Sequence, residues 1–150
     1  MTSSALILTQ EIKDLVNGAL VNGNPMLLAA VDRDNRPVLS FRGSTAVQAD
    51  GQLGLWVRNQ QGGTIEAIRH NPHVALMYRS ATVPLLQFHG RARIVTDIAE
   101  RNRVFEAAPE RERQADPERT GIAVVVELDK VSGVLGFKDG APIFVQLLSE

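Results

Sequence analysis

The residues best suited to chemistry in this sequence lie in two stretches that together could bind an anion. Arg42 and Ser44 stand two positions apart in a strand pattern, where side chains repeat every two residues, so a guanidinium and a hydroxyl would point to one side. Gly62, Gly63 and Thr64 follow an apolar strand and open a short helical segment, whose free backbone N–H groups also favour an anion. The spacing predicts a phosphate site.

Each of these residues also has an ordinary explanation. Arg42 is compatible with a surface arginine, and residues 62–64 with a glycine-rich connection that caps a helix. Trp56 is expected in the core rather than against a cofactor. Gln87 stands in mid-strand among apolar neighbours, so its half-buried amide needs a partner, which either the backbone or the polar ring edge of a ligand could supply.

Side-chain catalysis has little support in the sequence. The histidines show no spacing typical of a metal site: His70 and His73 are expected at the surface, and His89 in a half-buried strand position. No Ser/His/Asp order or G-x-S-x-G motif is present. The absence of cysteine excludes disulfides, thiolate metal sites and cysteine nucleophiles.

Composition narrows the class of partner. The 150 residues fit one domain, residues 1–150, with a core of its own. Sixteen Lys and Arg against 17 Asp and Glu leave a net charge of −1, which argues against a nucleic-acid or membrane-surface partner and favours a small-molecule ligand. The apolar run 5–8 is too short for a signal peptide, and no run approaches the ~20 residues that span a bilayer. We expect a cytoplasmic protein.

The elements that must position these residues are mostly strands. Helices are expected over 10–20, capped by Thr9, over 64–70, stopped by Pro72, and after Asp97 through 108, where Asp97 and Glu100 form a capping box. Apolar runs predict strands at 26–31, 37–42, 44–49, 52–59, 74–78, 85–95, 122–128, 131–137 and 142–148. Many short antiparallel strands with few helices indicate a barrel or sandwich.

Local signals fix several connections. The Asp50-Gly51 and Asp139-Gly140 pairs predict tight primed turns, because Gly and Asp tolerate the positive φ angles required. Gly90 predicts a bulge in its strand. Residues 110–119 carry seven charges in ten positions and are interpreted as a solvated connection, with at most one helical turn and no chemistry.

At these residues the chain resembles the pyridoxamine 5'-phosphate oxidase-like family of FMN-binding split barrels. The resemblance covers most of the length and rests on the order of the segments RPVLSFRGSTAV, LGLWVRN, HNPHVAL and LLQFHGRARIV. The Asn-Pro closure of the short helix before a Val-Ala-Leu strand is its most recognisable feature. It implies a mainly β antiparallel split barrel that forms homodimers, with FMN in the groove between subunits.

The resemblance also implies a set of cofactor-binding residues. They are Arg42, Ser44, Thr45, Val57, Arg58, Asn59, Gly62, Gly63, Thr64 and Gln87. Arg42 falls on a phosphate contact, with the two hydroxyl residues after it; residues 57–58 fall on the strand along the isoalloxazine ring, and Gln87 near a family glutamine that meets the flavin. Apolar residues on both sides of the strand at 122–126 further favour dimerisation.

The sequence departs from the family pattern at three places. Gly63 and Thr64 stand where many members carry a basic pair, so phosphate binding would depend mainly on Arg42. Val47 stands where family oxidases have a lysine, and the sequence ends at Glu150 before the segment with which they grip the vitamin. We therefore expect a reaction other than pyridoxamine phosphate oxidation.

Three hypotheses follow. The first is a flavin-dependent oxidoreductase acting on an unknown small molecule, in which the FMN ring carries the redox chemistry. The second is a reductase that uses a deazaflavin in the same groove. The third is a non-catalytic protein that binds a flavin or haem, with His89 or His70 as candidate haem ligands.

Overall fold

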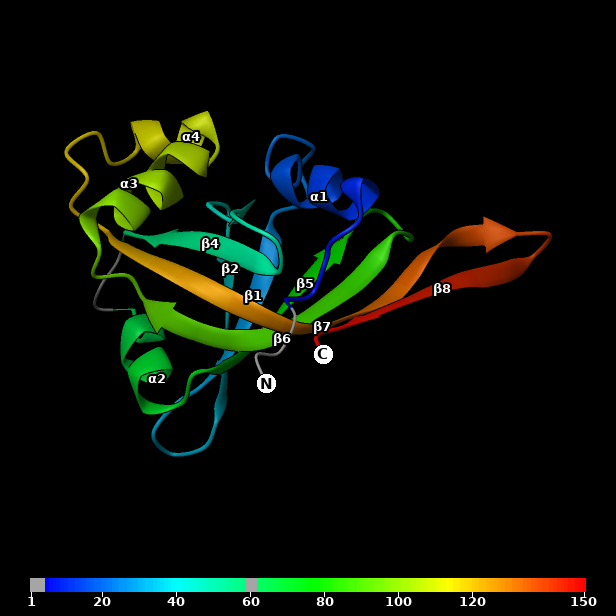
Figure 1. Cartoon of the computed structure of the whole chain (residues 1–150), viewed down its shortest axis with the longest axis horizontal. Helices are drawn as coiled ribbons and strands as arrows, with labels where there is room; N and C mark the ends of the chain where they lie inside the picture. Colours follow the sequence, from blue (N-terminus) through cyan, green and yellow to red (C-terminus); the bar gives the residue numbers. More distant parts are fainter. Residues whose placement is uncertain (1–4, 59–61) are drawn as a thin grey trace.

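In the computed structural model, which describes residues 5–58 and 62–150, a curved antiparallel sheet forms the centre of the molecule (Figure 1). The strands along the described residues are β1 Met26–Val31, β2 Pro37–Arg42, β3 Ala46–Val47, β4 Gln52–Val57, β5 His73–Arg79, β6 Leu85–Ile94, β7 Ile122–Lys138 and β8 Ala141–Leu148. Their order is β2-β1-β5-β6-β7-β4-β3, with β8 paired to β7. The predicted mainly β antiparallel architecture is confirmed.

The helices along the described residues are α1 Gln10–Asn17, α2 Thr64–His70, α3 Ile98–Ala107 and α4 Glu110–Gln114. Two predicted caps are confirmed: the backbone N–H of Ile12 donates to Thr9 Oγ1 at 3.3 Å, and that of Glu100 to Asp97 Oδ2 at 2.8 Å. α1 is shorter than predicted, because the chain turns at its C-cap residue Gly18. None of the helices in the described ranges is long and apolar enough to span a bilayer.

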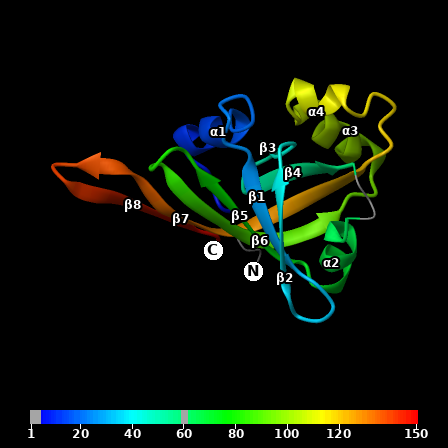
Figure 2. The ribbon, with the colours of Figure 1, turned by 180° about the vertical axis from the view of Figure 1, so that it is seen from behind.

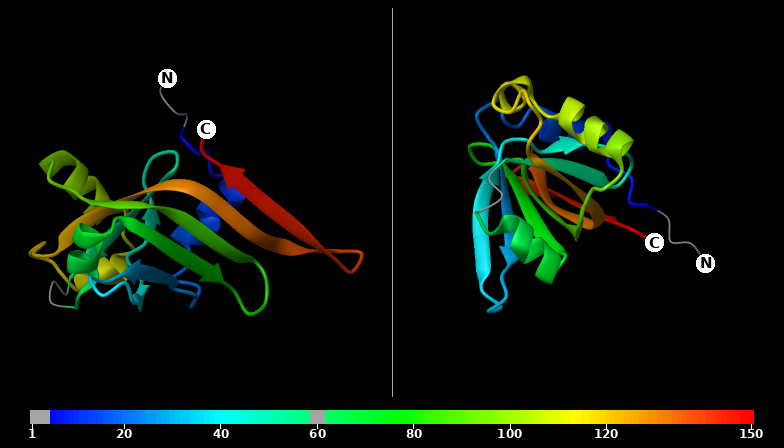
Figure 3. Two further views of the ribbon diagram at one scale, coloured as in Figure 1. Left: turned by 90° about the horizontal axis from the view of Figure 1, so that it is seen from below. Right: turned by 90° about the vertical axis from the view of Figure 1, so that its left-hand side faces the viewer.

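The strand order forces the sheet to curl. β2 and β3 lie at opposite ends of the order, yet only residues 43–45 connect them in the chain, so the two ends of the sheet must come together. The right-hand view in Figure 3 shows this curl. The seam between β2 and β4 is therefore closed by a three-residue connection instead of a ladder of backbone hydrogen bonds.

β7 is buried on both faces at its first half, as the sequence predicted. Val124 and Val126 belong to the main core inside the curl, together with Leu28, Leu55 and Phe88. Alternate positions face the other way: Ala123 and Val125 pack with Trp56, Val95, Val104 and Phe105 in a second cluster. Figure 2 shows α3 over β4 and β7 at this end, and the β7–β8 hairpin projecting at the other.

The turn predictions had mixed outcomes. Asp139 and Gly140 both have positive φ, 53° and 80°, and join Lys138 to Ala141 as a primed turn. At the Asp50-Gly51 turn only Gly51 has positive φ, 68°, so the predicted primed geometry is wrong there. The register shift between His89 and Gly90 skips Asp129 of β7, so the extra residue lies in β7, and the bulge predicted in the strand of Gly90 is on the wrong strand.

The strand predicted at 44–49 is also wrong in its extent, because only Ala46 and Val47 pair with β4. Side-chain hydrogen bonds hold the residues before them. Ser44 bonds to the Trp56 backbone, and Thr45 Oγ1 donates to the Arg42 carbonyl at 2.7 Å. Such local bonds compete with strand pairing. The chain therefore leaves β2 at Arg42 and crosses the seam as a connection.

Candidate functional site

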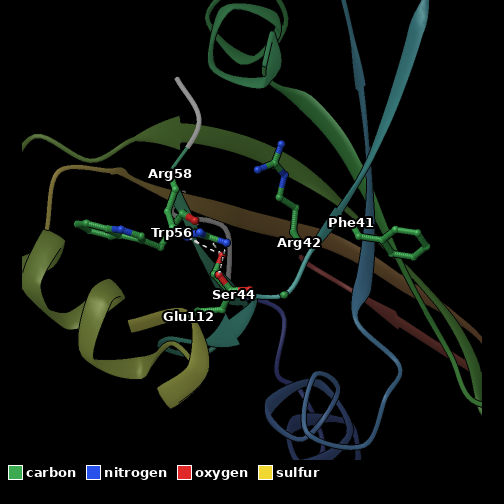
Figure 4. Close-up of a pocket in the computed structure, with 7 residues that line it drawn as sticks. Phe41, Arg42, Ser44, Trp56, Arg58 and Glu112 are labelled. Carbon is green, nitrogen blue, oxygen red and sulfur yellow. Dashed lines mark hydrogen bonds and ion pairs between the residues drawn. The ribbon is translucent and has the colours of Figure 1, made fainter. Parts of the chain in front are cut away.

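A cavity of about 210 Å³ opens at the seam between the two ends of the sheet (Figure 4). Its walls come from the end of β2 and the connection after it, from the end of β4, and from α4. The lining residues are Phe41, Arg42, Gly43, Ser44, Trp56, Arg58 and Glu112. The topology thus collects polar side chains from three separate parts of the chain.

Arg42 is the central cation of this site. It lies on the core-facing side of β2, and its guanidinium turns toward α2, with Nε donating to Ser40 Oγ at 3.1 Å and Nη2 to Thr64 Oγ1 at 2.6 Å. Burial lowers the pKa of Arg42 and the nearby charge of Glu112 raises it. Both hydrogen-bond acceptors are hydroxyl groups, so these contacts leave the positive charge available to an anion.

Ser44 and Thr45 are buried and hold the seam together. The Trp56 N–H donates to Ser44 Oγ at 2.9 Å, and Ser44 Oγ donates to the Trp56 carbonyl at 3.1 Å. The premise that Arg42 and Ser44 share a strand face is wrong, because β2 ends at Arg42. Ser44 thus ties the connection after β2 to β4, while Thr45 bonds back to Arg42, and we infer that the bonds of Ser44 set the width of the cavity.

Gly62, Gly63 and Thr64 lie beside Arg42 at the start of α2. The cap residue is Gly63, with φ of 86°, and Thr64 is the first helical residue and is buried. A Cβ built on Gly63 would meet none of the described atoms within 4 Å. Because α2 has only seven residues, we assign the anion-binding capacity to Arg42 and Thr64 instead of to a helix dipole.

Of the predicted residues at the end of β4, Arg58 lines the cavity and Val57 does not. Val57 is fully buried in the main core. The Arg58 side chain is 49% exposed and pairs through Nη2 with Glu112 Oε2 at 3.4 Å. Asn59 lies outside the described residues. Trp56 is buried in the second cluster, which confirms its predicted place in the core.

Gln87 lies on another part of the surface. Its side chain is exposed, so the predicted half-buried position is wrong for the single chain. It borders a separate depression of about 180 Å³ on the outer face of the sheet, with Leu27, Leu39 and Met77. Its Oε1 lies 3.3 Å from His89 Nε2. One copy of the chain therefore does not bring Gln87 to the Arg42 cavity.

The histidines lie where the sequence predicted. His70 and His73 are exposed, and His89 is half-buried.

Sequence analysis missed two acidic residues in the charged segment 110–119. Glu112 lines the cavity, and Asp116 is buried behind it, accepting hydrogen bonds from Trp56 Nε1 and the Gly121 N–H, both at 2.8 Å. Burial opposes ionisation of Asp116, but these bonds outweigh it and hold its pKa at about 2. Pro109, the cap residue of α4, is a local signal for a second helix. No local feature of the sequence indicates that Glu112 and Asp116 contact residues at β4.

The arrangement is suited to a phosphate-bearing ligand of modest size. Arg42 offers a cation and its partner Thr64 a hydroxyl, the cavity is lined by Arg42 and Arg58, and exposed Phe41 adds an apolar wall. This donor set fits the phosphate of FMN, although Glu112 places a negative charge in the same cavity.

Comparisons with known proteins identify the relatives of this chain. In Group A Streptococcus, HupZ has a solved structure with a TM-score of 0.65 and 22% identity, covering 91% of this chain and 99% of that one. A candidate 5-nitroimidazole antibiotic resistance protein from Bacteroides thetaiotaomicron aligns with a TM-score of 0.62 and 14% identity, over 100% and 93% of the two chains.

A third solved structure is that of a protein from Clostridium acetobutylicum, which is described as related to general stress protein 26 of B. subtilis and as a member of the pyridoxinephosphate oxidase family. It aligns with a TM-score of 0.60 and 14% identity, covering 92% of this chain and 96% of that one. At these identities the similarity establishes the split-barrel fold alone. No curated protein matches the sequence significantly. The sequence profile named pyridoxamine 5'-phosphate oxidase matches residues 8–131, which is most of the chain. The chain therefore belongs to the pyridoxamine 5'-phosphate oxidase-like family.

Proposed function

We propose that this protein binds FMN and is a flavin-dependent oxidoreductase acting on a small-molecule substrate. The observation that carries the proposal is the hydrogen bond of 2.6 Å from Arg42, which lines the cavity, to Thr64. A guanidinium without a contacting carboxylate among its hydrogen-bond acceptors, next to a hydroxyl, is the donor set a phosphate group requires. Membership of the family supports FMN as the ligand that carries this phosphate.

The active form we propose is a homodimer with the cofactor in the groove between subunits. The cavity of about 210 Å³ in one chain is below the roughly 300–1,000 Å³ usual for ligand pockets, so a second copy would complete it. Phe41 and Leu39, 70% and 67% exposed, lie on the outer face of β2 next to the cavity. This apolar face also bears Gln87, which could reach the cofactor only if the site continues along it.

Bound FMN would supply the redox chemistry, and the chain would supply binding and orientation. Arg42 and Thr64 would hold the phosphate, while the backbone at Val57 and the side chain of Arg58 would border the ring. Ser44 keeps the two walls at a fixed separation through its two bonds to Trp56. Phe41, covered by the second copy, would keep water from the ring.

A deazaflavin is the second candidate for the cofactor. The observation that favours it is the weak positive charge beside Arg42: Gly63 and Thr64 bring no basic side chain, and Glu112 brings an acidic one. The affinity of such a site for its cofactor would depend less on the cofactor's phosphate and more on its ring and the side chain of that ring.

The visible spectrum of the purified protein is the first test. We expect flavin absorption, or quenching of FMN fluorescence on titration if the protein is isolated without cofactor. Competition with a deazaflavin then separates the two candidates, and a tenfold preference for FMN, about 1.4 kcal/mol, decides for the first. A colourless protein that binds neither compound would contradict the proposal. Tight binding without turnover of any electron acceptor would instead favour a non-catalytic binder.

A further inference from the structure

Glu112 occupies the cavity that the proposed function assigns to an anion. Its side chain is only 16% exposed, and its Oε2 lies 3.4 Å from Arg58 Nη2. Its charge also acts on Arg42, where it raises the pKa of the guanidinium against the effect of burial. The carboxylate thus pairs with Arg58 in a cavity that Arg42 also lines, although the guanidinium of Arg42 points away from it (Figure 4).

The fold holds this carboxylate in place from two directions. On one side, α4 is tied to the end of α3, because Arg113 Nε donates to the Ala108 carbonyl at 3.0 Å. On the other, Asp116 accepts from Trp56 Nε1 at 2.8 Å and ties the segment to β4. Glu112 therefore sits on a short helix anchored at both ends, and its position over the seam is set by the fold.

Gly43 provides the space for Glu112. A Cβ at position 43 would lie 2.5 Å from Glu112 Oε1 and 3.1 Å from Leu20 Cδ1, which is closer than real contacts of this kind. The backbone at Gly43 thus accommodates the carboxylate within the three-residue connection. The other glutamate of α4, Glu110, is exposed and bonds to Gln114 on the helix surface, away from the cavity.

We propose that Glu112 is a specificity-determining residue, whose carboxylate takes the place of a ligand anion beside Arg58, in the cavity that Arg42 also lines, and so disfavours phosphate-bearing ligands relative to their neutral counterparts. A phosphate entering the cavity must displace this carboxylate from Arg58 or bind against its charge. Two like charges a few ångströms apart repel strongly in a partly buried site. The inference rests on the proposed function only for the identity of the ligand.

The test compares Glu112→Gln with the matched control Glu110→Gln, which removes the same charge from the exposed side of the same helix. Inorganic phosphate is titrated into each full-length variant by calorimetry, with the fluorescence of Trp56, the only tryptophan of the chain, as a second readout. We expect Glu112→Gln to bind phosphate about tenfold more tightly than the wild type, about 1.4 kcal/mol. Glu110→Gln should change the affinity by less than about twofold.

FMN and riboflavin, which differ by the phosphate, are then titrated into the same variants. Glu112→Gln should raise the ratio of FMN affinity to riboflavin affinity by about the same tenfold factor. Equal phosphate affinities of Glu112→Gln and wild type, or no phosphate binding by either, would overturn the role of Glu112. Failure of every variant to bind either flavin would instead count against the proposed function, and the phosphate titration would still decide the role of Glu112.

Discussion

Arg42 Nη2 donates a hydrogen bond of 2.6 Å to Thr64 Oγ1, which joins the last residue of β2 to the first residue of α2. The two residues are 22 positions apart in sequence and come from different elements of the fold. A ligand phosphate at this point would be bound by two elements whose relative position the barrel fixes. Such preorganisation lowers the entropic cost of binding a ligand.

Replacing Arg42 should remove most of the phosphate affinity. Hydrogen bonds to a charged group contribute about 1.5–3 kcal/mol, so Arg42→Ala is expected to weaken FMN binding by roughly 10- to 150-fold. Quenching of FMN fluorescence gives the affinity, and circular dichroism checks the fold. Arg33→Ala, an exposed arginine in the β1–β2 turn, is the control and should bind like the wild type. Unchanged binding by Arg42→Ala would remove Arg42 from the site.

The Arg42–Thr64 pair should show coupling. Thr64→Val keeps the β-branched shape and removes the acceptor, and we expect a loss of about 2- to 10-fold in FMN affinity. In Arg42→Ala/Thr64→Val the losses should not add, because each single change already breaks the shared contact. A double-mutant cycle of FMN affinities measures this. Strict additivity would mean that the two side chains bind independently.

Ser44→Ala should destabilise the protein. It leaves the buried N–H and carbonyl of Trp56 without their present partner, at a cost of about 1–3 kcal/mol. For a chain of this size the melting temperature should fall by roughly 2–4 °C for each kcal/mol. Urea unfolding gives the free energy directly, with Ser149→Ala as the control, since that exposed hydroxyl makes only a long 3.4 Å bond. Wild-type stability in Ser44→Ala would show that the seam does not depend on it.

Asp116 should make stability depend on acid pH. Its pKa of about 2 in the folded protein lies below the ordinary 3.8, so its contribution is complete above pH 3.8 and is lost as the pH falls toward 2. Asp116→Asn should lower the free energy of unfolding at pH 7 and reduce the extra loss between pH 4 and 2. Urea titrations followed by Trp56 fluorescence measure both. Identical acid profiles for the two proteins would assign the dependence to other groups.

The outer face of β2 should carry the dimer contact. Phe41→Asp places a charge on the face proposed to meet the second copy, and sedimentation should then give the 16.4 kDa monomer where the wild type gives a dimer. Ile98→Asp is the control, because this exposed residue lies on α3, away from that face. A dimer that survives Phe41→Asp would place the contact elsewhere.

Most of the fold was predictable because its signals are local. The alternation of apolar residues gave the strands, Thr9 and Asp97 gave two helix starts, and Asn71-Pro72 gave the end of α2. The strand at 44–49 was overpredicted because the bonds of Ser44 and Thr45 reach distant or backbone groups. Strand propensities do not include this competition between side-chain hydrogen bonds and strand pairing.

The candidate site was predictable only in part. Arg42, Gly63 and Thr64 were recognised from residue types and from the family resemblance, and the structure brings Arg42 and Thr64 together. Glu112 and Asp116 were missed because a run of alternating charges looks the same whether it is solvated or packed on another element. Their roles depend on contacts with Arg58 and Trp56, which lie more than 50 residues earlier in the chain. Only the tertiary structure shows these contacts.

The three-residue connection at 43–45 has a consequence for how such a site can change. It joins β2 to β3 at the seam, and it lies outside the ladder that stabilises the sheet. Inserting or deleting a residue there would alter the width of the opening while leaving every strand register intact. The size of ligand admitted could therefore shift by small steps in loop length, provided that the bonds of Ser44 to Trp56 are kept.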